Sequence, residues 1–174
     1  VYMDENKSTL NIILMKNFEG KNNKNILSKD DFLSMKGIEN SHSAGENFKY
    51  KKTDFLSYFH GEEQILYETI DGILLGADMK QGQVKPREKK ELNCMDTGDF
   101  EEELERLATQ NDFREFIEFL YKNPKSFKVE NGAKQCEDYD KMFKRVYNLF
   151  CSISEEYKEP VLKEASANIL MVSG

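Results

Sequence analysis

The chain has 174 residues, of which 39% are hydrophobic and 33% charged, and its formal net charge is −7. That length suits one folded domain, and the negative charge excludes general nucleic-acid binding, which needs a net basic surface. The apolar runs at 12–15 and 73–77 fall far short of the ~20 residues of a membrane-spanning helix, so we expect no transmembrane segment.

Helical periodicity begins near the amino terminus. Apolar residues spaced three and four apart predict an amphipathic helix over 2–19. A Ser-x-x-Asp capping pattern at Ser28 and Asp31 predicts a short helix over 28–36. The next segment, 37–52, is polar and contains Gly, Ser and Asn, which is typical of a long loop.

A second long helix is predicted over 54–76. Its apolar side chains fall within roughly 60° of one another on a helical projection; they are Phe55, Phe59, Leu66, Ile70 and Ile73. Gly61 and Glu62 interrupt this stripe without changing its phase. Either Glu62 is a polar group within the core of a continuous helix, or Gly61 and Glu62 form a surface turn.

The middle of the chain is strongly charged. Pro86 suits a first helical position, so a charged helix is expected over 86–95. The segment 99–122 is also expected to be helical, but its apolar residues change face at "QND", residues 110–112. The helix either kinks or breaks there, or it is buried on two sides.

The most regular pattern lies near the carboxyl terminus. Apolar and aromatic residues spaced alternately three and four apart predict a helix over 133–158 with one apolar seam; they are Cys136, Tyr139, Phe143, Val146, Phe150, Ile153 and Tyr157. We expect this seam to be buried within the molecule. Pro160 ends the helix and begins a last short one over 160–172.

Together these elements predict an all-α fold in a single domain over 1–174. The arrangement expected is an antiparallel four-helix bundle with additional short helices. No strand-type alternation of any length is present. Long connections over 20–52 and 77–98 allow either up-down order or a crossover.

The three cysteines raise the question of disulfides and metal binding. Cys136 and Cys151 lie roughly 22 Å apart along one helix, beyond the ~7 Å between Cα atoms that a disulfide allows, so we expect no bond between them. A bond from Cys94 to either of them stays open. Without a Cys-x-x-Cys pair, a zinc site is not expected.

No catalytic motif is recognisable in the chain. An enzymatic function would need His42 or His60 within hydrogen-bond reach of a nucleophile or carboxylate in a pocket, and such partners meet in space rather than in sequence. The chain has no Gly-x-Ser-x-Gly turn and no Gly-rich phosphate loop. We therefore expect no catalytic, cofactor-binding or metal-binding residues, no cofactor and no enzymatic activity.

The layout of the chain resembles the sporozoite cell-traversal proteins of malaria parasites (Plasmodium), in particular a small type that forms no pores. The resemblance rests on the segments 53–75 and 136–157 and carries no short motif. It implies a secreted helical bundle, stored in micronemes and then released, that is used when sporozoites breach host cells. It supplies no catalytic residues.

Two functions are compatible with a helical bundle. The first is a secreted, non-enzymatic protein that acts on host membrane lipids, with opening of the bundle at a polar layer such as Glu62 exposing the seam. The alternative is a helical adaptor that binds a host or parasite protein through a surface groove. Liposome binding by the pure chain would separate the two.

Overall fold

A computed structural model of the chain describes residues 8–22, 31–80, 82–94, 96, 118, 137, 139–164 and 166–174. In chain order its elements are β1 (Thr9–Lys16), α1 (Met35–Tyr50), β2 (Ser57–His60), α2 (Gln64–Gly76), β3 (Arg87–Glu88), the 3₁₀ helix η1 (Lys90–Leu92), α5 (Tyr139–Glu156), α6 (Lys158–Glu164) and β4 (Ser166–Ser173). Strands and helices both contribute, so the architecture is α/β.

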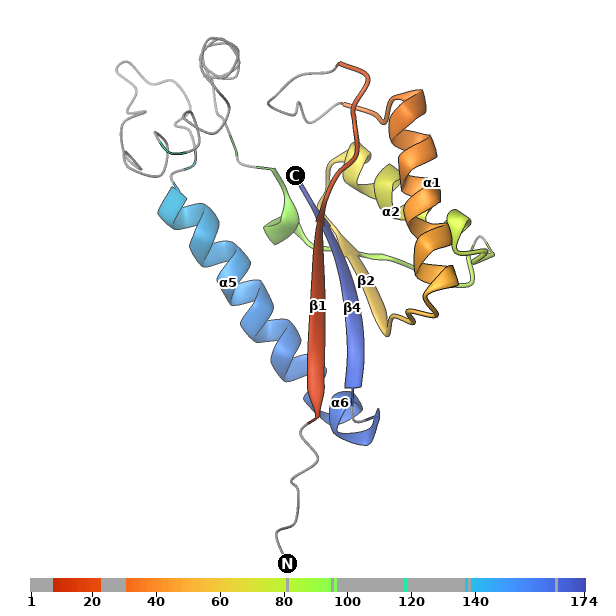
Figure 1. Ribbon diagram of the computed structural model, residues 1–174. Helices are drawn as coiled ribbons and strands as arrows, with labels where there is room; N and C mark the ends of the chain where they lie inside the picture. The colour runs from red at the N-terminus through yellow and green to blue at the C-terminus, as the bar shows by residue number, and fades with distance from the viewer. Residues whose placement is uncertain are drawn as a thin grey trace, which may run out of the picture.

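The described strands form one parallel sheet in the order β1-β4-β2-β3 (Figure 1). β4 is inserted between β1 and β2, and it pairs with β1 over eight residues, from Thr9 opposite Ser166 to Lys16 opposite Ser173. On its other side β4 pairs with β2 as far as His60 opposite Val172. The carboxyl ends of the strands therefore meet at one edge of the sheet, beside the carboxyl terminus of the chain.

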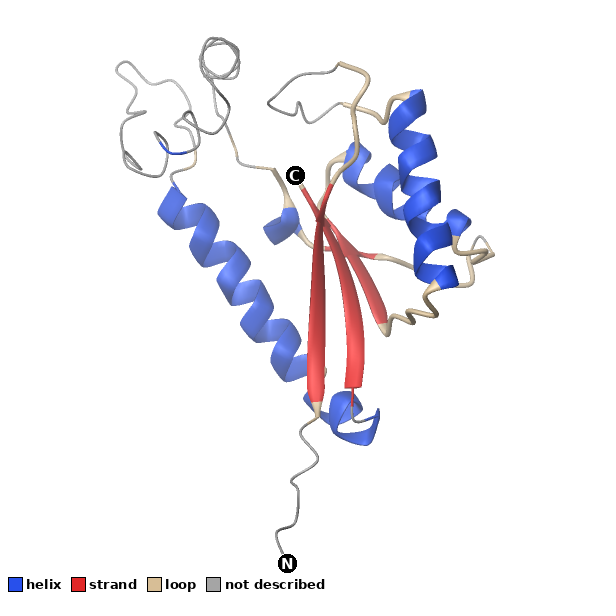
Figure 2. Ribbon diagram, in the orientation of Figure 1, coloured by secondary structure: helices blue, strands red, loops and turns tan. Residues whose placement is uncertain are grey.

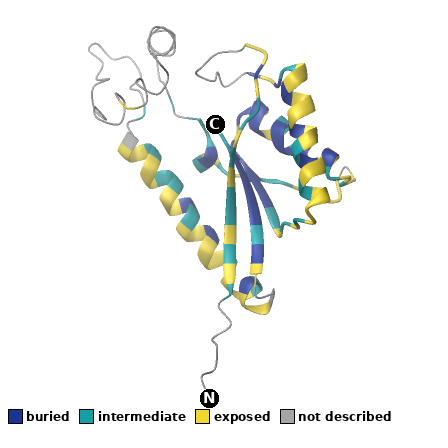
Figure 3. Cartoon of the chain, in the orientation of Figure 1, coloured by how far each residue is buried: buried dark blue, intermediate teal, exposed yellow. Residues whose placement is uncertain are grey.

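Helices cover both faces of the sheet (Figure 2). α1 and α2 lie over one face, where the buried core is Leu33, Tyr58, Ile65, Leu66, Ile70, Ile73, Leu74, Leu170 and Val172. α5 and η1 lie over the other face, where the buried core is Phe59, Leu92, Leu149, Ile153, Ile169 and Met171. Burial is concentrated in β4, β2 and the helix faces turned toward them (Figure 3).

The expected all-α bundle is wrong. The apolar runs at 12–15 and 169–172 pair with each other as parallel strands. A short continuous apolar run does not distinguish a buried parallel strand from a buried helical segment. The helix expected over 54–76 is likewise divided into β2 and α2, and the one over 86–95 into β3 and η1.

The loop expected over 37–52 is helix α1. Ser34 begins it, since its hydroxyl accepts a hydrogen bond from the Gly37 N–H at 3.0 Å. Its buried residues, Gly37, Ser41 and Gly45, are spaced one turn apart. A Cβ on Gly45 would lie 2.0 Å from the Ile73 carbonyl oxygen of α2. The small residues that suggested a loop are therefore a close helix-packing face.

Helix α5 confirms the helix predicted near the carboxyl terminus, but not its buried face. Ile153 is fully buried, as the seam requires. Phe143, another seam residue, is 58% exposed, whereas Leu149, which is not on the seam, is 3% exposed. The buried face of α5 is therefore rotated from the seam.

Several sequence predictions fall outside the described residues. They are the helix over 99–122, its change of face at residues 110–112, and the placement of Cys136. In the part of the chain that the structure describes, no helix is long and apolar enough to cross a membrane.

Candidate functional site

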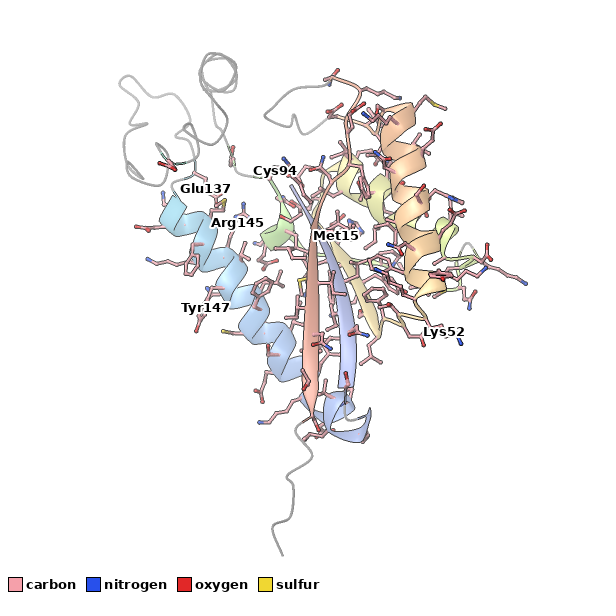
Figure 4. The ribbon with its side chains drawn as sticks, in the orientation of Figure 1. Met15, Lys52, Cys94, Glu137, Arg145 and Tyr147 are labelled. Atoms are coloured by element: carbon pink, nitrogen blue, oxygen red, sulfur yellow. The ribbon has the colours of Figure 1, made fainter. Side chains whose placement is uncertain are left out.

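The carboxyl edge of the sheet is the place to look for a site. In parallel α/β sheets ligands bind in the crevice outside the carboxyl ends of the strands, because the loops that follow the strands converge there. In this chain that edge is formed by the residues after β1 and β2, by the segment after β3, and by Gly174 after β4. Figure 4 labels Cys94, Glu137 and Arg145 in this region.

His60 is the last residue of β2 and is 6% exposed. Its Nδ1 lies 2.6 Å from the Gly61 carbonyl oxygen. A carbonyl oxygen can only accept, so Nδ1 carries the hydrogen and, in the neutral ring, Nε2 keeps its lone pair. The ring also makes an edge contact with Tyr67 of α2, with centroids 5.5 Å apart. This arrangement presents an imidazole with a fixed tautomer at the end of a strand.

Two glutamates in the turn after β2 are fastened to the segment that follows η1. The Glu62 N–H donates to Asn93 Oδ1 at 2.7 Å, and the Asn93 amide donates back to Glu62 Oε2 at 2.7 Å. The Cys94 N–H donates to Glu63 Oε1 at 2.8 Å. Residues 93–94 are thus tied to the turn between β2 and α2. Glu62 is exposed in that turn, so the surface-turn interpretation holds and no polar layer for bundle opening exists there.

Arg145 of α5 holds the same segment from the other side. Its guanidinium donates to the backbone carbonyls of Glu91, Asn93 and Cys94. It also makes a two-pronged ion pair with Glu137, with Nε–Oε1 at 2.7 Å and Nη2–Oε2 at 3.0 Å. A planar guanidinium can serve carbonyls and a carboxylate at once because its donors point in fixed directions. The segment is therefore clamped between α5 and the turn after β2.

Burial changes the acid–base behaviour of this cluster. It raises the pKa of Glu63, against the lowering effect of the backbone hydrogen bonds and of Arg145. It also raises the pKa of the Cys94 thiol to about 12, with a further contribution from the charge of Glu63. Cys94 is therefore a protonated thiol at neutral pH and is unsuited to be a nucleophile.

Three buried oxygen atoms near this edge have no hydrogen-bond partner in the structure. They are Asn17 Oδ1, Asp31 Oδ2 and Glu63 Oε2. Buried acceptors without donors are uncommon in folded proteins and raise the question of what they bind. Within the described ranges, however, no group of three or more His, Cys, Asp and Glu side chains is arranged to hold a metal ion.

The two arginines that the structure describes are both engaged by carboxylates. Arg145 pairs with Glu137, and Arg87 pairs with Glu156 of α5 and lies over the Phe59 ring, 5.0 Å from its centroid. Lys16, at the end of β1, lies close enough to Cys94 to lower the pKa of the thiol. Lys16 and the amino terminus of α2, which begins four residues after His60, also place positive charge at this edge.

The residues singled out from sequence have separate places. His42 is on the exposed surface of α1, where it pairs with Glu46 at 3.5 Å. Cys94 and Cys151 are free thiols, so neither forms the disulfide that was left open, and Cys151 is not bonded to Cys136. Glu63 and Arg145 were missed, because nothing local distinguishes a clamping residue from the many exposed charges of this chain.

No family model matches the chain, and no curated protein matches it in sequence. Solved structures, however, match the chain in fold. Phosphoglycerate mutase from Bacillus anthracis str. Sterne superposes with a TM-score of 0.67 at 19% identity, over 97% of this chain and 77% of that chain. The fold is that of phosphoglycerate mutase.

Phosphatases share the phosphoglycerate mutase fold and are also similar to this chain. The alpha-ribazole phosphatase from Shigella flexneri gives a TM-score of 0.60 at 21% identity, over 93% of this chain and 72% of that chain. A mycobacterial glucosyl-3-phosphoglycerate phosphatase, solved in complex with inorganic phosphate, gives 0.62 at 14% identity, over 92% of this chain and 70% of that chain.

These likenesses correct the functional expectations drawn from sequence. The resemblance to sporozoite cell-traversal proteins is wrong, since the chain folds as an α/β protein similar to a mutase and to phosphatases. A non-enzymatic bundle acting on host membranes and a helical-bundle adaptor are both overturned with the bundle itself. The expectation that the chain is not an enzyme is overturned by the enzymes whose fold it shares.

Proposed function

We propose that this chain is an enzyme of phosphate-ester chemistry, hydrolysing or transferring the phosphoryl group of a small phosphomonoester at the carboxyl edge of its sheet. The observation that carries the proposal is His60, an imidazole of fixed tautomer at the end of β2, within a fold shared with phosphoglycerate mutase and several phosphatases. Parallel α/β sheets bind their ligands at this edge.

His60 supplies the nucleophile. Histidine is among the side chains that form covalent intermediates in enzymes. With Nδ1–H committed to the Gly61 carbonyl, the Nε2 lone pair attacks the phosphorus of the phosphomonoester monoanion while the ester P–O bond breaks, and the alcohol leaves with the proton that the monoanion carried. Water then attacks the phosphorylated imidazole and releases phosphate.

The surroundings of His60 suit an anion. The amino terminus of α2 places partial positive charge close to the ring, and Lys16 lies on the same edge. Glu88 lies opposite His60 in the sheet. The two glutamates of the following turn are moderated: the pKa of Glu63 is raised by burial, and the Glu62 carboxylate accepts a hydrogen bond from Asn93. A phosphate beside His60 therefore meets less repulsion than the glutamate pair suggests.

The test is release of inorganic phosphate by the purified chain from p-nitrophenyl phosphate and from a panel of sugar, glycerate and nucleoside monophosphates. We expect turnover that His60→Gln reduces by at least ~100-fold. His42→Gln is the matched control, because His42 is an exposed histidine on α1, where it pairs with Glu46. Its turnover should match the wild type.

Two results would contradict the proposal at different levels. If the wild-type chain neither turns over nor binds any phosphomonoester of the panel by calorimetry, the proposed reaction is wrong. If turnover is present but His60→Gln and His42→Gln leave it equally intact, the reaction stands and the role of His60 is wrong. Phosphate trapped on His60 in acid-labile form, located by peptide mass analysis, would support both.

A further inference from the structure

The peptide unit between Gly61 and Glu62 makes a hydrogen bond at each of its polar ends. Its carbonyl oxygen, which belongs to Gly61, lies 2.6 Å from His60 Nδ1. Its N–H, which belongs to Glu62, donates to Asn93 Oδ1 at 2.7 Å. A trans peptide unit is planar, and its C=O and N–H point in opposite directions, so a bond at one end fixes the direction of the other. Asn93 is therefore connected to the ring of His60 through a single rigid group.

The side chain of Asn93 is itself held in one orientation. Its amide nitrogen donates to Glu62 Oε2 at 2.7 Å, while its amide oxygen accepts from the Glu62 N–H. If the amide turned over, it would present a donor to the N–H and an acceptor to the carboxylate. The backbone carbonyl of Asn93 accepts from Arg145 Nη2 at 2.9 Å. A Cβ on Gly61 would lie 2.8 Å from Asn93 Oδ1, so a glycine there lets the amide approach the peptide unit closely.

We propose that Asn93 is a positioning residue for His60, because it holds the peptide unit after Gly61 in the orientation that keeps the hydrogen on Nδ1 and the lone pair on Nε2. The bond to Asn93 Oδ1 also polarises the peptide unit, which makes the Gly61 oxygen a stronger acceptor. Without that bond the unit can rotate, and the Gly61 oxygen no longer selects between the two neutral tautomers of the ring. The effect of Asn93 on the ring depends only on these hydrogen bonds, whereas its effect on turnover rests on the proposed function.

Other contacts of His60 fix the place of the ring and not its tautomer. Tyr67 of α2 meets the ring at an edge, with centroids 5.5 Å apart. The Lys89 N–H donates to the backbone carbonyl of His60 at 2.8 Å. Neither contact gives Nδ1 an acceptor. Selection of the tautomer therefore belongs to the Gly61 carbonyl and, through the peptide unit, to Asn93.

The test observes the tautomer directly, by nitrogen-15 NMR of the imidazole rings at about pH 9, where histidines are neutral. The chain has two histidines, so His42→Gln assigns the signals of His60. In the wild type we expect the hydrogen on Nδ1 of His60. Asn93→Ala should give a mixture of tautomers. The control is Asn11→Ala, which removes an exposed asparagine of β1 and should leave the tautomer of His60 unchanged.

Turnover of p-nitrophenyl phosphate gives a second measurement on the same variants. Asn93→Ala should lower kcat about tenfold or more and change KM little, because it disturbs the orientation of the nucleophile and leaves substrate binding intact. Asn11→Ala should match the wild type in both constants.

A reciprocal pair of variants separates positioning from a general loss of structure. Asn93→Asp keeps an acceptor for the Glu62 N–H but sets a second carboxylate against that of Glu62. Adding Glu62→Gln restores a donor and an acceptor with their direction reversed. The double variant should therefore recover the wild-type tautomer and turnover, whereas Asn93→Asp alone should not. Thermal unfolding shows which variants are folded, and if Asn93→Ala does not fold, the reciprocal pair decides.

Three results would overturn the role of Asn93. They are a hydrogen on Nε2 of His60 in the wild type, an unchanged tautomer in folded Asn93→Ala, and a double variant that behaves like Asn93→Asp. Failure of the proposed function would look different. If the wild type shows the expected tautomer and Asn93→Ala disturbs it, but no variant turns over a phosphomonoester, Asn93 does position His60 and the proposed reaction is wrong.

Discussion

Glu63 Oε1 accepts a hydrogen bond from the Cys94 N–H at 2.8 Å, joining two residues that lie 31 positions apart. Arg145 reaches the same segment from α5 through the Cys94 carbonyl at 3.3 Å. The turn after β2, the segment after η1 and helix α5 are therefore one connected unit at the carboxyl edge of the sheet. A substitution in this unit should therefore change both its stability and the pKa values of its titratable groups.

The pH dependence of stability should report on Glu63. Burial raises its pKa above the ~4.3 of an unfolded chain, so its stabilising contribution is full below that value and is lost as pH rises through the folded pKa. The Glu63→Gln variant cannot ionise at this position. Its free energy of unfolding, minus that of wild type, should therefore be larger at about pH 7 than at about pH 4.

Urea unfolding of wild type and Glu63→Gln at both pH values measures this effect. If the difference in free energy of unfolding between wild type and Glu63→Gln is the same at both pH values, Glu63 does not titrate between them.

The thiols of Cys94 and Cys151 should differ in reactivity. Burial and the neighbouring Glu63 charge raise the pKa of Cys94 to about 12, so its thiolate fraction at pH 8 is on the order of 10⁻⁴. Cys151 is exposed on α5. We expect iodoacetamide at pH 8 to label Cys151 at least ~100-fold faster, as measured by peptide mapping. In guanidinium the two thiols should be labelled at equal rates. Equal rates in the folded chain would contradict the placement of Cys94.

Arg145 should matter more for stability than Arg87. The Arg145 and Glu137 side chains are 20% and 13% exposed, whereas those of Arg87 and Glu156 are 42% and 41% exposed. Removing one partner of a poorly solvated pair leaves the other charge without compensation, so Arg145→Gln should lower the free energy of unfolding by about 2–4 kcal/mol.

Arg87→Gln is the matched control. Loss of its solvated pair with Glu156 should lower the free energy of unfolding by only about 0–1 kcal/mol. Both variants are compared with wild type by urea unfolding at neutral pH. Equal losses would mean that the segment after η1 is not held by the guanidinium of Arg145.

Truncations on α5 should identify its buried face. Leu149 is 3% exposed, so Leu149→Ala should cost about 2–5 kcal/mol through lost burial and the cavity left behind. Phe143 is 58% exposed, so Phe143→Ala should change stability by less than ~1 kcal/mol although it removes a larger side chain. A larger loss for Phe143→Ala would restore the seam that the heptad spacing suggested.

The candidate site was only partly visible in the sequence. His60 could be singled out as one of two histidines, but its role in the candidate site depends on its position at the end of β2, where Nδ1 contacts the Gly61 carbonyl oxygen. The clamp has no sequence signature, because Glu63, Cys94 and Arg145 come from three separate parts of the chain. The raised pKa values of Glu63 and Cys94 follow from burial, which is a property of packing.

The sequence by itself determined helix α5, since periodic apolar residues fix a helix through contacts only three and four residues apart. It did not determine the strands. Residues 12–15 and 169–172 are short apolar runs whose local preferences fit a helix or a strand, and only their pairing with each other, across nearly the whole chain, makes them parallel strands. Helix identity was decided by neighbours along the chain; strand identity and the site at the sheet edge were decided by tertiary contacts, because a strand's hydrogen bonds are made with another segment.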